Sequence, residues 1–469
     1  MPSVKPEPAA APPAAGPLEK VKGQPQQLRG MKDILPADQP YWDAVRQAVE
    51  RLAVGAGFAR IETPVLEAAS LFNRTVGQET DIVEKEMYTF LDRGGDKVAL
   101  RPENTAGVAR AYLEHGMVSW PQPVKLWYLG SFFRHDRPQA GRYRQFWQFG
   151  FEVLGDGHPV IDAMLIYLAV TVYRSFQVPV EIQINSLGDK NCRPAYLRLL
   201  GEYFRTRKNS LCEDCKRRLQ KNPLRILDCK VPDCHTVSQD APQIVDHLCQ
   251  ACKDHFVHVL EYLGELEIPY NLNPRVVRGL DYYTRTVWQV VEEGALETGG
   301  QSDLGGGGRY DDLLEQLGNR QVPAAGFASG VERLIIKMRE RQFAPKVESP
   351  DVFLAQLGEP ARKKCLKLYD VLRSIELKVV EAFSKDGLKP QLEVANRLGV
   401  KYALIVGQKE IMDDTILIRD MENGIQEVVD FKKVVPEIQK RLARVAAAPT
   451  DGRSKAAPAE QGSSSGGES

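Results

Sequence analysis

The chain has 469 residues, of which 62 are Lys or Arg and 62 are Asp or Glu, so its formal net charge is zero. With 43% hydrophobic and 26% charged residues, its composition excludes a fibrous or wholly disordered protein. No stretch approaches the roughly 18 uninterrupted apolar residues of a membrane span, and the first residues lack the features of a targeting segment. We therefore expect a soluble, cytoplasmic protein of about three folded units.

The two ends of the chain differ in composition from the middle. Residues 1–27 contain seven Pro and five Ala, and residues 446–469 contain no Val, Leu, Ile, Met or aromatic side chain. Such segments bury too little apolar surface to offset the entropy of ordering. We therefore expect disordered tails at 1–27 and 446–469.

Periodicity predicts the first elements of the folded part. Apolar residues at helical spacing predict a helix over Tyr41–Val54, and a strand carrying Pro64 is expected over Ala59–Leu66. From Val124 to Leu154 the pattern has period two around a polar segment, which predicts a β-hairpin with a long tip. Strand patterns are absent from 191 to 266, where helical patterns and cysteines predict an inserted helical subdomain.

The remaining chain divides in two. Strand patterns return at Val276–Val291 and Ala324–Ala328. From 350 to 445 strands alternate with helices, which predicts a separate small α/β domain. The expected organisation is a core at 28–345 that contains the insert at 191–266, followed by this domain.

Parity sorts the side chains of the hairpin. Odd positions of its second strand are large and apolar, so they should face a core: Trp147, Phe149, Phe151 and Val153. Even positions of that strand, with three residues of the first strand, should share the other face: Arg144, Phe146, Gln148, Glu152, Tyr128, Phe132 and Arg134. This face can stack a planar base, grip a polar substrate and hold an anion. A mixed, solvent-facing sheet surface would show the same pattern.

Five stretches resemble the signatures of one family. Residues 61–67 (IETPVLE), 133–148 (FRHDRPQAGRYRQFWQ) and 326–334 (GFASGVERL) are similar to motifs 1, 2 and 3 of class II aminoacyl-tRNA synthetases. Residues 278–286 (RGLDYYTRT) and 305–311 (GGGGRYD) resemble signatures of the histidyl-tRNA synthetase family. The motifs stand in the family's order, so their combination is far more specific than any one of them.

The resemblance implies a fold and a reaction. The fold would be α+β, with a class II antiparallel-sheet catalytic core, an inserted helical subdomain and a C-terminal α/β anticodon-binding domain. The reaction would be activation of histidine by ATP with Mg²⁺ to histidyl-adenylate, followed by transfer to the 3′ end of tRNA(His). A homodimer is also implied.

The resemblance also implies roles for individual residues. Catalysis is assigned to Arg134, Arg278 and Arg333, and ATP binding to Arg134, Phe146 and Arg333. Histidine binding is assigned to Glu103, Thr105, Gln148, Glu152, Tyr283 and Tyr310, and tRNA binding to Arg137, Gln139 and Arg142 at the hairpin tip. Arginines suit this chemistry because a carboxylate attacks a phosphate, and two unit charges about 4 Å apart interact by roughly 4 kcal/mol at an effective dielectric near 20.

Two alternatives stay open at this point. Arg285, Arg309 and Asp311 could simply pair with neighbouring charges. The whole chain could be a non-catalytic regulatory subunit that partners an ATP phosphoribosyltransferase, although such paralogues typically lack the C-terminal domain and the signature arginines. The chain contains no Gly-x4-Gly-Lys-Ser/Thr loop, so a P-loop ATPase is unsupported.

The insert has two further features. Close cysteine pairs in a reducing cytoplasm favour zinc over disulfides, so we expect a structural zinc held by Cys212, Cys215, Cys249 and Cys252. Buried free thiols are the alternative. Since the adenylation residues lie elsewhere, loss of this metal should weaken tRNA charging and spare adenylation. Residues 205–225 hold eight basic and two acidic residues, a pattern that a solvated helix face or a tRNA contact would explain.

Overall fold

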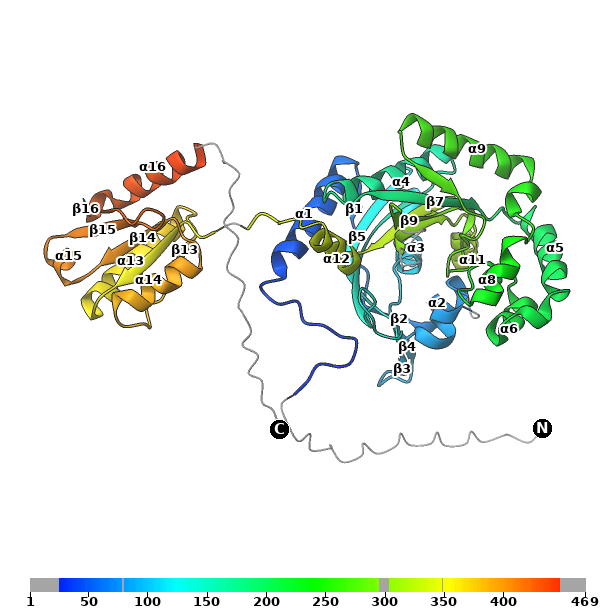
Figure 1. Ribbon diagram of the computed structural model, residues 1–469, viewed down its shortest axis with the longest axis horizontal. Coiled ribbons are helices and arrows are strands. Elements are labelled where there is room, and N and C mark those ends of the chain that lie inside the picture. The colour runs from blue at the N-terminus through cyan, green and yellow to red at the C-terminus, as the bar shows by residue number, and fades with distance from the viewer. Residues whose placement is uncertain (1–24, 78–79, 295–302, 348, 448–469) are drawn as a thin grey trace, which may run out of the picture. The chain divides into compact units, whose positions relative to one another are not determined.

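The computed structural model describes residues 25–77, 80–294, 303–347 and 349–447 (Figure 1). The chain divides between Lys346 and Val347 into two compact units. The two expected tails lie almost wholly outside the described residues, but helix α16 (Val434–Ala447) continues two residues past the expected start of the second tail. Among the described residues, no helix has both the length and the apolar character needed to cross a membrane.

An eight-stranded sheet forms the centre of the first unit. Its strands lie in the order β1 (Ala59–Arg60), β5 (Val124–Phe133), β6 (Gln145–Leu154), β11 (Ala324–Gly330), β10 (Asp303–Arg309), β9 (Thr284–Glu292), β7 (Val180–Ser186) and β8 (Tyr270–Leu272). All neighbours from β5 to β7 are antiparallel, whereas the edge strands β1 and β8 pair in parallel. The expected antiparallel core is therefore confirmed.

One face of this sheet is covered by helices. These are α1 (Gln39–Gly55), α4 (Pro159–Arg174), α9 (Gln250–Glu265) and α12 (Val331–Glu340). Phe149, Phe151 and Val153 of β6 are fully buried in the core beneath them, with Trp147 packed at its edge. The parity prediction for the apolar face of the hairpin is thus confirmed.

The structure corrects two predicted strands. The segment predicted as one strand over Ala59–Leu66 is split, because β1 ends at Arg60 and Leu66 begins β2 (Leu66–Ala68) of another sheet. Pro64 lies in the gap and has no N–H to donate to a ladder. The second strand begins at Thr284 rather than at Val276, since Arg278 before it has φ 57°, which is not extended backbone.

Smaller elements complete the first unit. A three-stranded sheet contains β2, β4 (Lys97–Leu100) and β3 (Thr89–Leu91), beside α2 (Ala69–Thr75), the short π-helix η1 (Ile82–Glu86), α3 (Thr105–Glu114) and α11 (Leu313–Gly318). Residues 191–266 are all described and contain no strand. They form α5 (Arg193–Arg205), α6 (Glu213–Lys221), α7 (Leu224–Leu227), α8 (Pro232–Gln239) and α9.

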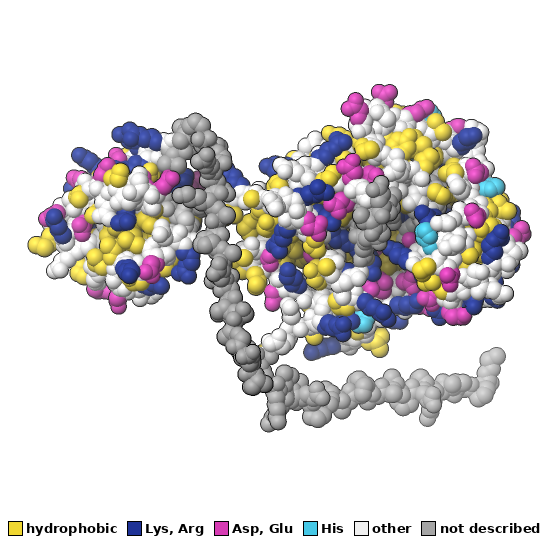
Figure 2. All heavy atoms as spheres, viewed as in Figure 1, with side chains coloured by type: hydrophobic (Ala, Val, Ile, Leu, Met, Phe, Trp, Pro, Cys, Tyr) yellow, Lys and Arg dark blue, Asp and Glu magenta, His cyan; other side chains and the backbone are white. Residues whose placement is uncertain are grey.

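The second unit is a small α/β domain. Its sheet has the order β13 (Val379–Glu381), β12 (Val352–Gln356), β14 (Tyr402–Val406), β15 (Thr415–Asp420) and β16 (Gln426–Asp430). The unit also contains the helices α13 (Glu359–Ser374), α14 (Leu388–Arg397), α15 (Gln408–Met412) and α16. Figure 2 shows basic and acidic side chains interspersed over the visible surface of each unit, in keeping with the zero net charge.

Candidate active site

The first unit contains a cavity of about 500 Å³ on the polar side of the β5–β6 hairpin. Of the ten residues that the resemblance assigns to catalysis, histidine and ATP, eight line this cavity: Arg134, Arg278, Arg333, Glu103, Thr105, Phe146, Gln148 and Tyr283. These residues come from segments more than 200 positions apart in the chain, and the sheet brings them together. The other two, Glu152 and Tyr310, lie behind the lining residues and are fully buried.

Arg134 is fixed at the end of β5. Its Nε donates a hydrogen bond to the carbonyl of Pro102 at 2.9 Å, and its guanidinium carbon lies 5.2 Å from the centre of the Phe146 ring. Burial lowers the pKa of Arg134, although the charges of Glu86 and Glu103 oppose this shift. The side chain therefore offers a positioned cation beside an aromatic plate.

Arg278 approaches the cavity from a strained backbone position. Its φ of 57° lies in the left-handed region that non-glycine residues seldom adopt. Its Nε is buried without a hydrogen-bond partner, and Nη1 lies 4.0 Å from the Asp303 carboxylate. A Cβ on Gly306 would lie 2.5 Å from the backbone oxygen of Trp288 and 2.7 Å from Nη1, so this close approach requires glycine.

Arg333 links the hairpin tip to strand β10. It lies in the first turn of α12, and its Nε donates to the carbonyl of Gly141 at 3.2 Å. Its Nη1 donates to the backbone carbonyl of Asp303. Asp303 thus contacts Arg278 through its side chain and Arg333 through its main chain.

A network of hydroxyl groups surrounds Glu152. Tyr310 donates to one carboxylate oxygen at 2.5 Å, and Thr105 donates to the other at 2.8 Å. Tyr128 lies 3.4 Å from that second oxygen. Burial raises the pKa of Glu152 to about 8, against the opposing effect of these hydrogen bonds. Thr105, which lines the cavity, separates Glu152 from it.

Glu103 is held by backbone N–H groups, whereas Glu152 is held by side-chain hydroxyl groups. Its two oxygens accept the backbone N–H groups of Thr105 and Ala106, at 2.7 and 3.0 Å, at the start of helix α3. Burial raises the pKa of Glu103, and these N–H groups oppose the shift because they bind the ionised form. The cavity therefore contains a carboxylate placed to receive a cationic group.

The residues assigned to tRNA lie at the hairpin tip. Gln139 and Arg142 pair with each other through an isolated bridge, and the Arg142 Nε lies 3.2 Å from the Asp136 carboxylate. Arg137 is exposed, whereas Arg142 also lines the cavity. Of the three residues assigned to tRNA, Arg142 alone lines the cavity.

Sequence reasoning missed the wall that the insert gives to the cavity. Arg225, Asp228 and Lys230 line it, together with Asp81 next to η1. Burial raises the pKa of Asp228, while the charges of Arg225, Lys230 and Arg278 oppose the shift. No periodicity marks these residues. The available signal was a cluster of charged residues among apolar ones in the stretch LRILDCK (224–230).

Arg285, Arg309 and Asp311 prove to pair with neighbouring groups. Arg309 is fully buried, and its Nη2 lies 2.6 Å from the Asp162 carboxylate of α4. Its Nη1 lies 3.2 Å from Asp311. Arg285 lies 3.6 Å from the Asp189 carboxylate. These residues hold the fold together behind the cavity.

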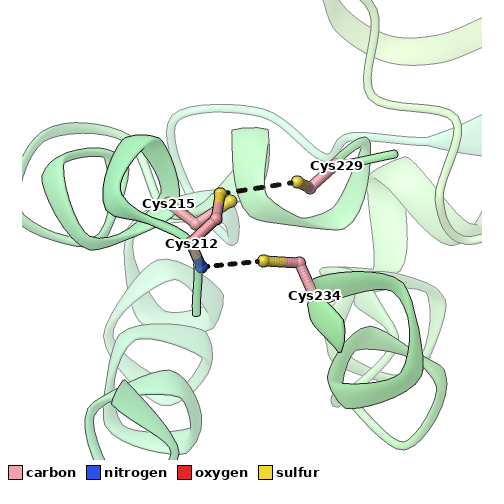
Figure 3. Close-up of side chains that lie close together, drawn as sticks. All are labelled: Cys212, Cys215, Cys229 and Cys234. Atoms are coloured by element: carbon pink, nitrogen blue, oxygen red, sulfur yellow. Dashed lines mark hydrogen bonds between the residues drawn. The ribbon is translucent and has the colours of Figure 1, made fainter. Parts of the chain in front are cut away.

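The structure corrects the expected zinc ligands. Cys212, Cys215, Cys249 and Cys252 do not form one cluster. Cys212 and Cys215 at the start of α6 lie instead with Cys229 and Cys234 (Figure 3), and Cys249 and Cys252 lie with Asp189 and Cys192. The reason is topological, since α7 and α8 fold back onto α6 before the chain reaches Cys249. In each group the ligand atoms lie within 4.8 Å of one another and could hold a metal ion.

Each of the two units matches the model of a known protein family. A model described as histidyl-tRNA synthetase matches residues 30–188 and 226–334. One described as an anticodon-binding domain matches 351–441. The first match spans both hairpin strands and Arg134, Arg278 and Arg333 of the cavity. The second lies in the unit that the regulatory-subunit alternative would lack.

Similar proteins lead to the same family. The chain is 46% identical over 419 residues to a histidine–tRNA ligase of Dehalococcoides mccartyi, covering 89% of this chain and 100% of that protein. It is 44% identical over 408 residues to one of Syntrophotalea carbinolica, covering 87% and 96%. The apo histidyl-tRNA synthetase of S. aureus superposes with a TM-score of 0.76 at 33% identity, covering 89% and 100%. The chain belongs to the histidyl-tRNA synthetase family.

Proposed function

We propose that the cavity of the first unit activates histidine with ATP, and that the chain then transfers the histidyl group to the 3′ end of tRNA(His). Membership of the family makes the chain an ATP-dependent aminoacyl-tRNA ligase. The observation that supports this site is the convergence of Arg134, Arg278 and Arg333 on one cavity that also contains a backbone-held carboxylate. These three arginines and the Glu103 carboxylate match a substrate pair with phosphates, a carboxylate and an ammonium group.

The first step joins two anions. A carboxylate oxygen of histidine attacks the α-phosphorus of ATP, the bond from that phosphorus to the bridging oxygen breaks, and pyrophosphate leaves. The attacking carboxylate is already ionised, so this step needs no general base. Arg134 and Arg278 act on the charge that develops at the α-phosphate, in positions fixed before the substrates arrive.

Histidine is placed by the polar groups of the hairpin face. Glu103 receives the ammonium group, and Gln148, Thr105 and Tyr283 supply further hydrogen bonds from the lining. Glu152 and Tyr310 take part from behind the lining, where a carboxylate among hydroxyls can accept an N–H of the imidazole. This arrangement requires the hydrogen bond between Thr105 and Glu152 to open when histidine binds.

ATP lies on the other side of the same cavity. Phe146 stacks against the adenine, and Arg333 covers the base and contacts the terminal phosphate. Mg²⁺ prefers oxygen ligands, and Glu86 and Glu332 line the cavity next to these arginines. Burial raises the pKa of Glu332 to about 7. When bound with ATP, the ion would neutralise phosphate charge.

The tRNA and a second copy of the chain complete the proposal. Arg137, Gln139 and Arg142 at the hairpin tip contact the acceptor end, since phosphate contacts position a nucleic acid. The second unit contacts the anticodon. We place the reaction in the cytoplasm and assign a homodimer as the working form.

The test is histidine-dependent exchange of labelled pyrophosphate into ATP. Purified protein should catalyse exchange with histidine and none with the other amino acids, and it should then charge tRNA(His) transcripts. An Arg134→Ala variant should lose both activities. Absence of exchange in folded wild-type protein would contradict the proposal.

A further inference from the structure

Four cysteines of the insert surround one point. Cys212 immediately precedes α6 and Cys215 lies in its first turn, Cys229 follows α7, and Cys234 lies on α8. Figure 3 shows these side chains approaching one another from the three helices. The four sulfur atoms all lie within 4.8 Å of one another. Cys215 and Cys234 are fully buried and Cys229 is 8% exposed.

The spacing of the sulfurs fits a metal ion better than a disulfide. The Cys212 and Cys229 sulfurs are 3.9 Å apart, nearly twice the length of a disulfide bond. Two sulfurs bound to one zinc at about 2.3 Å in a tetrahedron lie about 3.8 Å apart. The backbone N–H of Cys212 also donates to the Cys234 sulfur at 3.1 Å, which stabilises a thiolate more than a thiol.

The second cysteine group differs in its ligand set. Its fourth member is a carboxylate, Asp189, which accepts the backbone N–H of Asn191 at 2.9 Å and lies 3.6 Å from Arg285. Its charge already has partners in the protein. A set of four thiolates is the donor set typical of structural zinc, which distinguishes the first group from the second.

The first group adjoins the adenylation cavity. Cys229 stands between Asp228 and Lys230, which both line the cavity. Arg225, four residues before Cys229, donates to the backbone carbonyl of Arg278 at 2.6 Å. Arg218 of α6 binds the Asp81 carboxylate at 2.8 Å. A metal held by these cysteines would therefore fix a wall of the cavity and the backbone of a catalytic arginine.

We propose that Cys212, Cys215, Cys229 and Cys234 bind one Zn²⁺ ion, and that this ion holds residues 225–230 against the adenylation cavity. Cys212 and Cys215 lie in residues 189–225, between the two ranges that the family description matches. The ion is structural, because four thiolates leave no open position for substrate. Its loss reduces adenylation itself, in contrast to the expectation from sequence that adenylation is spared.

Metal content is the first test. Elemental analysis of tag-free wild-type protein should find zinc, and Cys229→Ser should lose one equivalent of it per chain. Cys249→Ser from the second group is the matched control and should keep that equivalent. Cobalt substituted into the wild-type protein should show the visible absorption of tetrahedral cobalt thiolate. Metal-free wild-type protein, or loss from Cys249→Ser but not from Cys229→Ser, would overturn the assignment.

The link between the zinc site and adenylation is tested with a second variant, because Cys229→Ser could simply unfold the insert. Arg225→Met should keep its zinc and yet reduce pyrophosphate exchange by about tenfold or more, since small displacements of a catalytic group are costly. The control is Arg198→Met, an exposed arginine of α5 in the same insert, which should keep both zinc and exchange. Equal exchange in the two variants would overturn the link.

This link rests on the proposed adenylation activity, whereas the metal content does not. If the wild-type protein contained zinc at these cysteines but catalysed no exchange, the zinc site would stand and the proposed function would fail. If the wild-type protein catalysed exchange without zinc, the proposed function would stand and the zinc site would fail.

Discussion

The floor and the wall of the cavity are held in place by different means. The floor comes from β5 and β6, whose ladder sets Gly130 opposite Gln148 and Leu126 opposite Glu152. The wall comes from short helices of the insert and is held by side chains, among them Arg218 and Arg225. A backbone ladder tolerates many single substitutions, but a wall held by a few side chains depends on each of them. The wall is therefore where small changes should reach the chemistry.

The largest effect is expected at Arg278, where floor and wall meet. Arg278→Ala should lower the rate of pyrophosphate exchange by about a hundredfold or more, because it removes a positioned cation from the developing charge. Binding of ATP and histidine should change much less. Exchange and equilibrium binding are measured together, with Arg198→Ala as the surface control. A rate within about threefold of wild type would contradict the role.

The next largest effect concerns the support beneath the floor. Arg309→Met removes the arginine partner of the buried Asp162, which keeps only the contact with His255 at 3.3 Å, and should lower the free energy of unfolding by about 3–5 kcal/mol. Arg341→Met breaks an exposed pair with Glu292 and should cost less than about 1 kcal/mol. Urea titration checks both, and Asp162→Leu added to Arg309→Met should recover much of the loss. If the two single variants lost the same free energy of unfolding, the buried pair would stabilise the protein no more than the exposed pair does.

A smaller effect is expected for the pH dependence of histidine binding through Glu152 of β6. Glu152, with a pKa near 8, is mostly protonated at pH 7 in the empty cavity. If it accepts an N–H of histidine, binding favours its ionised form, so histidine binds more tightly as pH rises from 7 to 8 and a proton is released. Calorimetry in buffers of different ionisation enthalpy measures that proton. Glu152→Gln should bind more weakly without this release, and unchanged release in the variant would rule Glu152 out.

The smallest effect is expected outside both regions. A chain shortened to residues 25–447 should keep its melting temperature and its aminoacylation rate, because the removed segments have compositions that favour no packed core. Thermal melting and tRNA charging check this. A fall of several degrees would show that one of these segments contacts the folded protein.

The sequence predicts which residues of the β5–β6 floor face the cavity, but it does not predict which residues of the insert form the wall. The reason is that alternation along a strand is local, whereas the wall depends on tertiary packing. The period-two pattern of β6 sorts Phe149 from Gln148 without knowledge of the fold, since alternation is local. The role of Asp228 depends on how α6, α7 and α8 fold back on one another. Which cysteines lie next to Cys215 depends on the same packing. Spacing in the sequence grouped it with Cys249 and Cys252, whereas the fold places it with Cys229 and Cys234.

The contacts of Asp303 change how substrate affinity should be understood. This residue offers its carboxylate to Arg278 and its main-chain oxygen to Arg333 before any phosphate is present. A phosphate that binds these arginines must compete with the Asp303 carboxylate at Arg278 and with the Asp303 carbonyl at Arg333, so the affinity for ATP is a difference between two competing ligands, one of which is part of the protein. The Asp303 carboxylate also offsets part of the mutual repulsion between the two guanidinium groups, which favours their positions before a phosphate binds.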